Sequence, residues 1–297
     1  NFLRTPDVLF EFNWFKKEKY QTYLEIEIKV ENIPSEFDLT KVYFINKYKL
    51  EFEVGILVAK SMFSICVKGR NCKKIKKKQK IIKNICNNVF NLCNVKLQIE
   101  GKPINNQAVL FVSNHHSYLD SLILRSLITN VYTIAKSETF DSFKILNGFT
   151  KAITEMWGVI EYKRGNKKSG IKVRKIIKDT IDNGKSVLVY PEGGAVAIGG
   201  PSFFYPGSFE VAYENNFIIQ PITLKYYTDV TWGKEHNLSQ SHHLNIMSNI
   251  KKMKQQKNKV SVIFHEPINP NKFVNAEHLK NYCHYKIVDK WIDLTLN

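Results

Sequence analysis

The sequence has few acidic residues for its size. It carries 27 Asp and Glu against 44 Lys and Arg, which gives a formal net charge of +17 over 297 residues. Such an excess indicates a polyanionic partner, whether nucleic acid, an anionic membrane face or a phosphorylated substrate. The apolar fraction of 43% is ample for a hydrophobic core. We therefore expect either one large folded domain or a domain with an appendage.

Cysteines and long apolar runs are also scarce. The cysteines are odd in number and lack CxxC spacing, which indicates free thiols in a reducing compartment rather than a disulfide framework or a zinc site. The longest apolar stretch, residues 54–67, is interrupted by Lys60. It is shorter than the about 20 residues of a membrane-spanning helix, so we interpret it as interfacial or buried. No secretory signal pattern is visible. The cysteines are Cys66, Cys72, Cys86, Cys93 and Cys283.

Motifs for two common chemistries are missing. The chain has no GxSxG nucleophile elbow. Its glycine-rich run, residues 193–200, matches neither the GxGxxG fingerprint nor the GK[ST] of a phosphate loop. A nucleotide-hydrolysing function is therefore disfavoured.

A basic segment without acidic residues follows the apolar stretch directly. It is either a solvated linker or a membrane-contact segment that gains about 1 kcal/mol per cation at an anionic leaflet. We favour membrane contact and expect residues 55–89 to provide it. Nucleic acid is disfavoured because aromatic residues do not interleave with the lysines. The basic residues are Lys68, Arg70, Lys73, Lys74, Lys76, Lys77, Lys78, Lys80 and Lys83.

Residues 1–54 alternate apolar and polar side chains in two places, 23–30 and 50–54, with a turn at 33–35 between them. This predicts a small β-rich appendage of unknown role.

From Val95 onward, strand and helix patterns alternate, which predicts an α/β fold with a mixed sheet layered with helices. A helix is expected to be capped by Ser169 and to end at Asn183-Gly184. The segment 244–253 is weakly amphipathic, and we expect it to pack against the rest of the fold. The predicted strands are 95–99, 109–113, 131–135, 158–162, 186–190, 218–224 and 260–264, and the other helices are 117–127 and 140–156.

The junction between the strand at 109–113 and the helix at 117–127 has two interpretations. In one, Ser117 caps the helix, Asp120 completes a capping box and the two histidines are polar loop residues. In the other, His115 is a general base and Asp120 fixes its tautomer. His116 has the better spacing to Asp120 on an ideal helix, but His115 precedes the helix and can fold back over its end.

Four blocks in order resemble the glycerolipid acyltransferases, the family of lysophosphatidic acid acyltransferase. Residues 114–120 (NHHSYLD) resemble its NHxSxxD block. The second block, a Gly followed six residues later by Arg, is matched by Gly158 to Arg164. The third, Phe-Pro-Glu-Gly, appears as Tyr190-Pro191-Glu192-Gly193, and the fourth as 218–222 (IIQPI). Residues 136–138 resemble a Lys-x-Glu element.

The resemblance implies a glycerol-3-phosphate acyltransferase-like fold over residues 90–297 and a role for each matched residue. His115 would be the base, Asp120 its orienting partner, and Pro221 would shape the sheet edge. Acceptor binding would fall to Arg164, Glu192, Gly193 and Lys136. The family often continues its third block with Thr-Arg-Ser where this chain has Gly194-Ala195-Val196. This block therefore lacks the hydroxyl and the cation that could hold the phosphate of an acceptor, whereas the transfer step is unaffected.

Together these features predict an enzyme that moves a fatty acyl chain from an acyl thioester, of CoA or acyl-carrier protein, to a lysophospholipid hydroxyl. Lysophosphatidic acid is the expected acceptor, with no metal, no cofactor besides the acyl donor and no nucleic-acid partner. We expect peripheral or monotopic association with the cytoplasmic face of a membrane. The alternative is a non-catalytic basic protein of the same fold that binds anionic lipid or nucleic acid.

Overall fold

The computed structural model describes most of the chain from residue 75 onward and short pieces before it. The described residues are 9–17, 21–29, 53–54, 56–57, 60–61, 64, 75–117, 119–136, 156–162, 167–194, 200–228 and 250–296.

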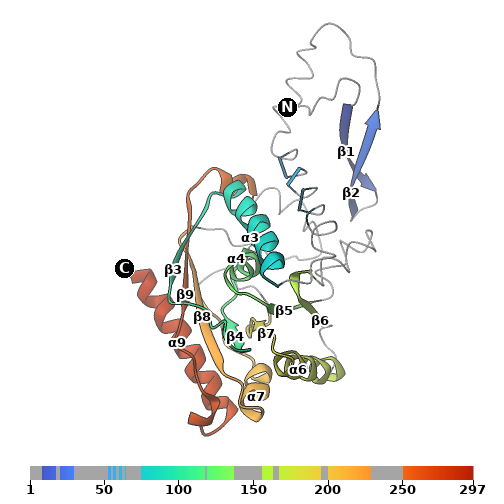
Figure 1. The fold of residues 1–297 in the computed structure, drawn as a ribbon. Coiled ribbons are helices and arrows are strands. Elements are labelled where there is room, and N and C mark those ends of the chain that lie inside the picture. Colours follow the sequence, from blue (N-terminus) through green and yellow to red (C-terminus); the bar gives the residue numbers. More distant parts are fainter. Residues whose placement is uncertain are drawn as a thin grey trace.

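A seven-stranded sheet forms the centre of the fold (Figure 1), with the order β3-β9-β8-β4-β7-β5-β6. All neighbouring strands are parallel except β8 and β9. The strands are β3 (Val95–Glu100), β4 (Leu110–Ser113), β5 (Val131–Lys136), β6 (Val159–Tyr162), β7 (Ser186–Val189), β8 (Ile219–Tyr226) and β9 (Asn258–Phe264). The predicted mixed α/β sheet layered with helices is confirmed.

Helices cover both faces of this sheet (Figure 1), as alternating side chains in the strands require. On one face, Phe111 of β4 shares a core with α3 (Ile75–Leu92) and α4 (Leu119–Leu127). On the other, Val112 shares a core with three helices. These are α6 (Lys167–Asp182), α7 (Gly207–Glu214) and α9 (Ala276–Leu296), with the short 3-10 helix η3 (Pro270–Lys272) ahead of α9.

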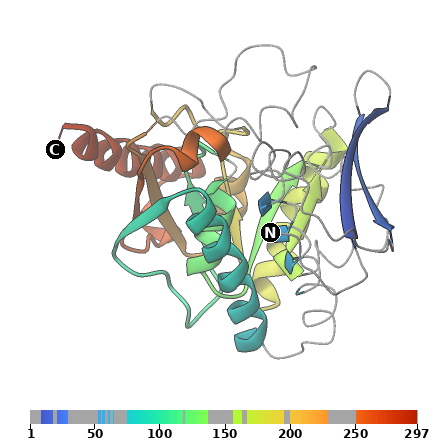
Figure 2. The same cartoon turned by 90° about the horizontal axis from the view of Figure 1, so that it is seen from above.

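Helix α3 is amphipathic, and Figure 2 shows it in front of the strands. Ile82 and Cys86 are completely buried, while Lys76, Lys80 and Lys83 are exposed. The predicted membrane-contact segment, 55–89, therefore includes a helix that anchors one face in the core and presents lysines on the other. Among the described residues, no helix is both long and apolar enough to cross a membrane.

Two predictions of local structure are wrong. Glu53 and Val54 have helical backbone instead of ending a strand over 50–54, because three alternating apolar residues are too short a pattern to distinguish the two. Helix α6 begins at Lys167, so Ser169 lies inside it and is not its cap. Its end at Asn183-Gly184 is confirmed: Gly184 has a φ of 71°, and its N–H and that of Lys185 bond back to the last turn.

The other local predictions have mixed outcomes. The strand predicted at 23–30 is confirmed as β2 (Gln21–Lys29), which pairs antiparallel with β1 (Leu9–Lys17). The helix predicted at 140–156 lies outside the described residues except for Met156. The predicted packing of 244–253 is confirmed at its end, where Met253 is helical and buried.

Candidate active site

Strand β4 places the first block at the carboxyl edge of the sheet. All four of its residues are buried between β7 and β8. The side-chain amide of the next residue, Asn114, then imitates a strand backbone: its Nδ2 donates to the Leu224 carbonyl and its Oδ1 accepts from the Leu224 N–H, both at 2.8 Å. The loop that carries His115 is therefore fixed to β8.

Helix α4 starts with the capping box that the sequence predicted. The Asp120 Oδ2 accepts the backbone N–H of Ser117 at 2.8 Å and that of His116 at 2.6 Å, while the Ser117 hydroxyl accepts the N–H of Leu119 at 3.3 Å. These bonds fix the position of the Asp120 carboxylate, which is completely buried.

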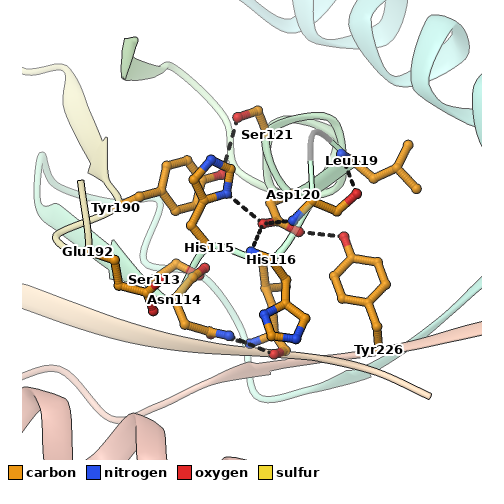
Figure 3. Close-up of polar contacts among 12 residues, drawn as sticks. Ser113, Asn114, His115, His116, Leu119, Asp120, Ser121, Tyr190, Glu192 and Tyr226 are labelled. Atoms are coloured by element: carbon orange, nitrogen blue, oxygen red, sulfur yellow. Dashed lines mark hydrogen bonds and ion pairs between the residues drawn. The ribbon is translucent and has the colours of Figure 1, made fainter. Parts of the chain in front are cut away.

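His115 folds back onto this carboxylate (Figure 3), with its Nδ1 2.7 Å from the Asp120 Oδ2. A carboxylate only accepts hydrogen bonds, so Nδ1 carries the ring proton and Nε2 is left as the basic nitrogen. The side chain of His115 remains 20% exposed, so a substrate can reach it. One Asp thus makes both the hydrogen bonds of the capping interpretation and the contact with His115 that the general-base interpretation requires.

Tyr226, at the end of β8, makes a further hydrogen bond to the Asp120 carboxylate. Its hydroxyl donates to the Asp120 Oδ1 at 2.5 Å (Figure 3). Burial, together with the charge and the hydrogen bond of Asp120, raises the pKa of Tyr226 well above its ordinary value. Sequence reasoning missed this residue; the available signal was a tyrosine at the end of a buried strand, whose hydroxyl needs a partner.

Tyr190 is a second residue whose role the sequence did not predict. Its ring stacks on the His115 imidazole, with centroids 4.2 Å apart and planes 20° from parallel. Its hydroxyl lies 3.3 Å from the Ser121 Oγ in α4. The ring therefore packs against the imidazole and restricts its orientation, and burial and the Asp120 charge raise the pKa of Tyr190.

Glu192 has a buried carboxyl next to this pair. Its Oε1 accepts the Ser202 N–H at 3.3 Å, and the His115 N–H also donates to the carboxyl. Burial raises its pKa to about 8, the Asp120 charge adds to the rise, and the two N–H groups oppose it. Its Oε2 is buried with no hydrogen-bond partner among the described residues.

A mainly apolar cavity of about 790 Å³ opens beside His115. Gly193 lines it and has a φ of 70°, a conformation that glycine adopts without strain. Tyr190 and Pro191 also line it, whereas Glu192 does not. Further lining residues are Leu122, Ile134, Trp157, Val159, Val173 and Ile177.

The structure places some of the other candidate residues outside this cavity. His116 is buried on the other side of the loop, stacked on Tyr226 at 6.0 Å, and burial lowers its pKa. Pro221 lies within β8 between β4 and β9 and does not line the cavity. Lys136 ends β5, and Arg164 lies outside the described residues.

Comparisons with known proteins show what this chain is similar to. Residues 94–225 match the family model described as Acyltransferase. A chloroplastic 1-acyl-sn-glycerol-3-phosphate acyltransferase of Arabidopsis thaliana is 32% identical over 132 residues, 43% of this chain and 36% of the relative. A 1-acyl-sn-glycerol-3-phosphate acyltransferase of Helicobacter pylori is 30% identical over 142 residues, 47% of this chain and 57% of the relative. The chain thus spans between about a third and just over half of these relatives.

A solved structure supports the fold assignment. The crystal structure of the 1-acyl-sn-glycerophosphate acyltransferase PlsC from Thermotoga maritima superposes with a TM-score of 0.51, over 86% of this chain and 93% of that chain, at 18% identity. The predicted glycerol-3-phosphate acyltransferase-like fold is therefore confirmed, as a fold.

Proposed function

We propose that this chain, which carries an acyltransferase-family domain over residues 94–225, transfers a fatty acyl chain from an acyl thioester to the free hydroxyl of lysophosphatidic acid. The product would be phosphatidic acid. The observation that carries the proposal is the 2.7 Å contact between His115 Nδ1 and Asp120 Oδ2 beside an apolar cavity that His115 lines.

The chemistry follows from the free nitrogen of His115. Its Nε2 takes the proton of the acceptor hydroxyl as that oxygen bonds to the thioester carbonyl carbon, and Asp120 stabilises the imidazolium that forms. The tetrahedral intermediate then collapses, the carbon–sulfur bond breaks, and the thiolate takes the proton from the imidazolium. An ester and a free thiol result, and no covalent intermediate on the protein is needed.

The cavity supports an acyl substrate. Its lining is dominated by aliphatic and aromatic side chains from α4, α6, β5 and β6, which suits a fatty chain more than a sugar or a nucleotide. The names of the sequence relatives agree with lysophosphatidic acid as acceptor. The donor, CoA or acyl-carrier protein, remains part of the proposal, as do acceptor contacts from Arg164 and Lys136.

Membrane association is the remaining part of the proposal. The acceptor is a membrane lipid, and the exposed lysines of α3 are suited to an anionic surface. We propose peripheral attachment at the cytoplasmic face.

The direct test is an acyl-transfer assay with purified full chain. Radiolabelled acyl-CoA or acyl-carrier protein would be supplied with lysophosphatidic acid, glycerol 3-phosphate or lysophosphatidylcholine, and the labelled lipids separated. Labelled phosphatidic acid as the main product is expected. Label found only in the product of another acceptor would show that lysophosphatidic acid is not the acceptor. No transfer with any pair of donor and acceptor would overturn the proposed function.

A further inference from the structure

The cavity beside His115 must accept a negatively charged head group if the proposed function holds, so cations must face it besides the Arg164 and Lys136 already proposed. The third block supplies none at this point, since Glu192 is followed by Gly193-Gly194-Ala195-Val196. Among the described residues that line the cavity, the arginines are Arg125 and Arg174.

Arg125 is already committed to the fold. It is buried, and its Nε donates to the Trp157 carbonyl at 3.0 Å. Its Nη1 donates to Gln79 Oε1 and the Ile128 carbonyl, and its Nη2 to the Met156 carbonyl. Binding a phosphate would require it to give up bonds that connect α3, α4 and the turn before β6.

Arg174 has the opposite character. It projects from α6 with its side chain 49% exposed, and its one carboxylate contact in the described structure is Glu210 of α7, with Nη1 2.5 Å from Oε2. Its guanidinium lies against Gly207, where an added Cβ would come within 3.6 Å of both Nε and Nη2. Gly207 lines the cavity as well, so this guanidinium is at the cavity rim.

We propose that Arg174 binds the phosphate of the lysophospholipid acceptor at this rim and exchanges Glu210 for the substrate when it does so. The proposal rests on the proposed acyl transfer. The exchange is energetically accessible because a partly exposed ion pair contributes little net stability, whereas a phosphomonoester carries more charge and matches the guanidinium fork.

The acceptor suits this position better than the donor. Only a few covalent bonds separate the acceptor's reactive hydroxyl from its phosphate, and His115 and Arg174 line the same cavity. In acyl-CoA, the whole pantetheine chain separates the thioester from the nearest phosphate. Arg174 is thereby assigned as a specificity residue for an anionic acceptor.

The chain offers a matched control on the same helix. Lys178 lies one turn after Arg174, is 47% exposed and pairs with Asp182 at 2.5 Å, but does not line the cavity. Lys178→Ala therefore removes one cation and one exposed ion pair from α6 without touching the cavity. Equal melting temperatures of the Arg174→Ala and Lys178→Ala proteins would establish equal folding.

The test measures binding and turnover separately. Calorimetric titration with short-chain lysophosphatidic acid and with the phosphate-free monoacylglycerol gives Kd for each, and steady-state assays give KM for acceptor and for acyl-CoA. Arg174→Ala should weaken lysophosphatidic acid binding by about tenfold or more and raise its KM similarly. Monoacylglycerol binding, the acyl-CoA KM and the Lys178→Ala protein should be unchanged, while Glu210→Gln should tighten lysophosphatidic acid binding.

The outcomes separate this inference from the function on which it rests. Arg174→Ala behaving like Lys178→Ala in an active enzyme, or equal wild-type affinity for the two acceptors, would overturn the role of Arg174 alone. A larger effect on the acyl-CoA KM would reassign Arg174 to the donor and also overturn it. Arg174-dependent binding of lysophosphatidic acid without any transfer would overturn the acyl-transfer function and retain the site.

Discussion

The hydroxyl of Tyr226 lies 2.5 Å from the Oδ1 of Asp120, on the side of the carboxylate opposite to the oxygen that accepts His115. The two ends of this contact are 106 residues apart in the chain. The capping box at the start of α4 and the tyrosine of β8 therefore both hold the Asp120 carboxylate. Its Oδ2 stays directed at the imidazole of His115.

Removing that hydroxyl should slow catalysis without changing substrate affinity. Tyr226→Phe is expected to lower kcat about tenfold, because Asp120 loses a fixed donor, and to cost about 1 kcal/mol of unfolding free energy. Tyr227→Phe is the control, since the neighbouring hydroxyl contacts Ser261 Oγ at 3.1 Å and not the site. Steady-state kinetics on both variants are the measurement. A raised KM with unchanged kcat would mean that Tyr226 does not act through Asp120.

Much of this arrangement follows from local sequence, and the part that does not is long-range. The capping box and the His115 to Asp120 contact both arise within six residues, where spacing along one helix turn fixes the geometry. Tyr226 ends β8 and Tyr190 directly follows β7, and only the order of strands in the sheet brings them to Asp120 and His115. No local pattern encodes that order.

Strand ends show the same limit. The strand predicted at 218–224 extends to Tyr226, because pairing with β9 continues to Val260. Apolar pattern locates the buried middle of a strand but not the residue at which its ladder ends, and here a functional residue lies at that end.

Glu192 should make stability depend on pH. Its pKa is raised to about 8 in the folded protein from an ordinary 4.5. The stability that the neutral Glu192 carboxyl contributes to the folded state is therefore complete below about pH 4.5. It is lost as the pH rises through about 8, by at most about 1.4 kcal/mol per pH unit. Glu192→Gln keeps a neutral side chain of the same shape, so the variant should gain stability relative to wild type at pH 9 and not at pH 5. Urea unfolding at both values tests this, and an identical difference at the two pH values would exclude a buried neutral carboxyl.

Membrane binding should have a salt-sensitive part. Replacing the lysines from Lys73 to Lys80 with glutamine should abolish the preference for anionic vesicles and leave weak binding through the apolar stretch at 54–67. At about 1 M salt, where the Debye length is about 3 Å, the wild type should behave like this variant. Flotation with anionic and neutral vesicles is the assay. Binding that is independent of charge and salt and resists alkaline extraction would indicate an integral anchor instead.

The central claim is that His115, and not its neighbour, is the base. Turnover with lysophosphatidic acid should fall about 10²- to 10⁴-fold in His115→Ala, because the proton acceptor is gone. His116→Ala should keep most of the wild-type kcat, because His116 faces away from the cavity and stacks on Tyr226. Melting temperatures of both variants would confirm that each is folded. Active His115→Ala beside inactive His116→Ala, or equal loss in two folded variants, would contradict the assignment.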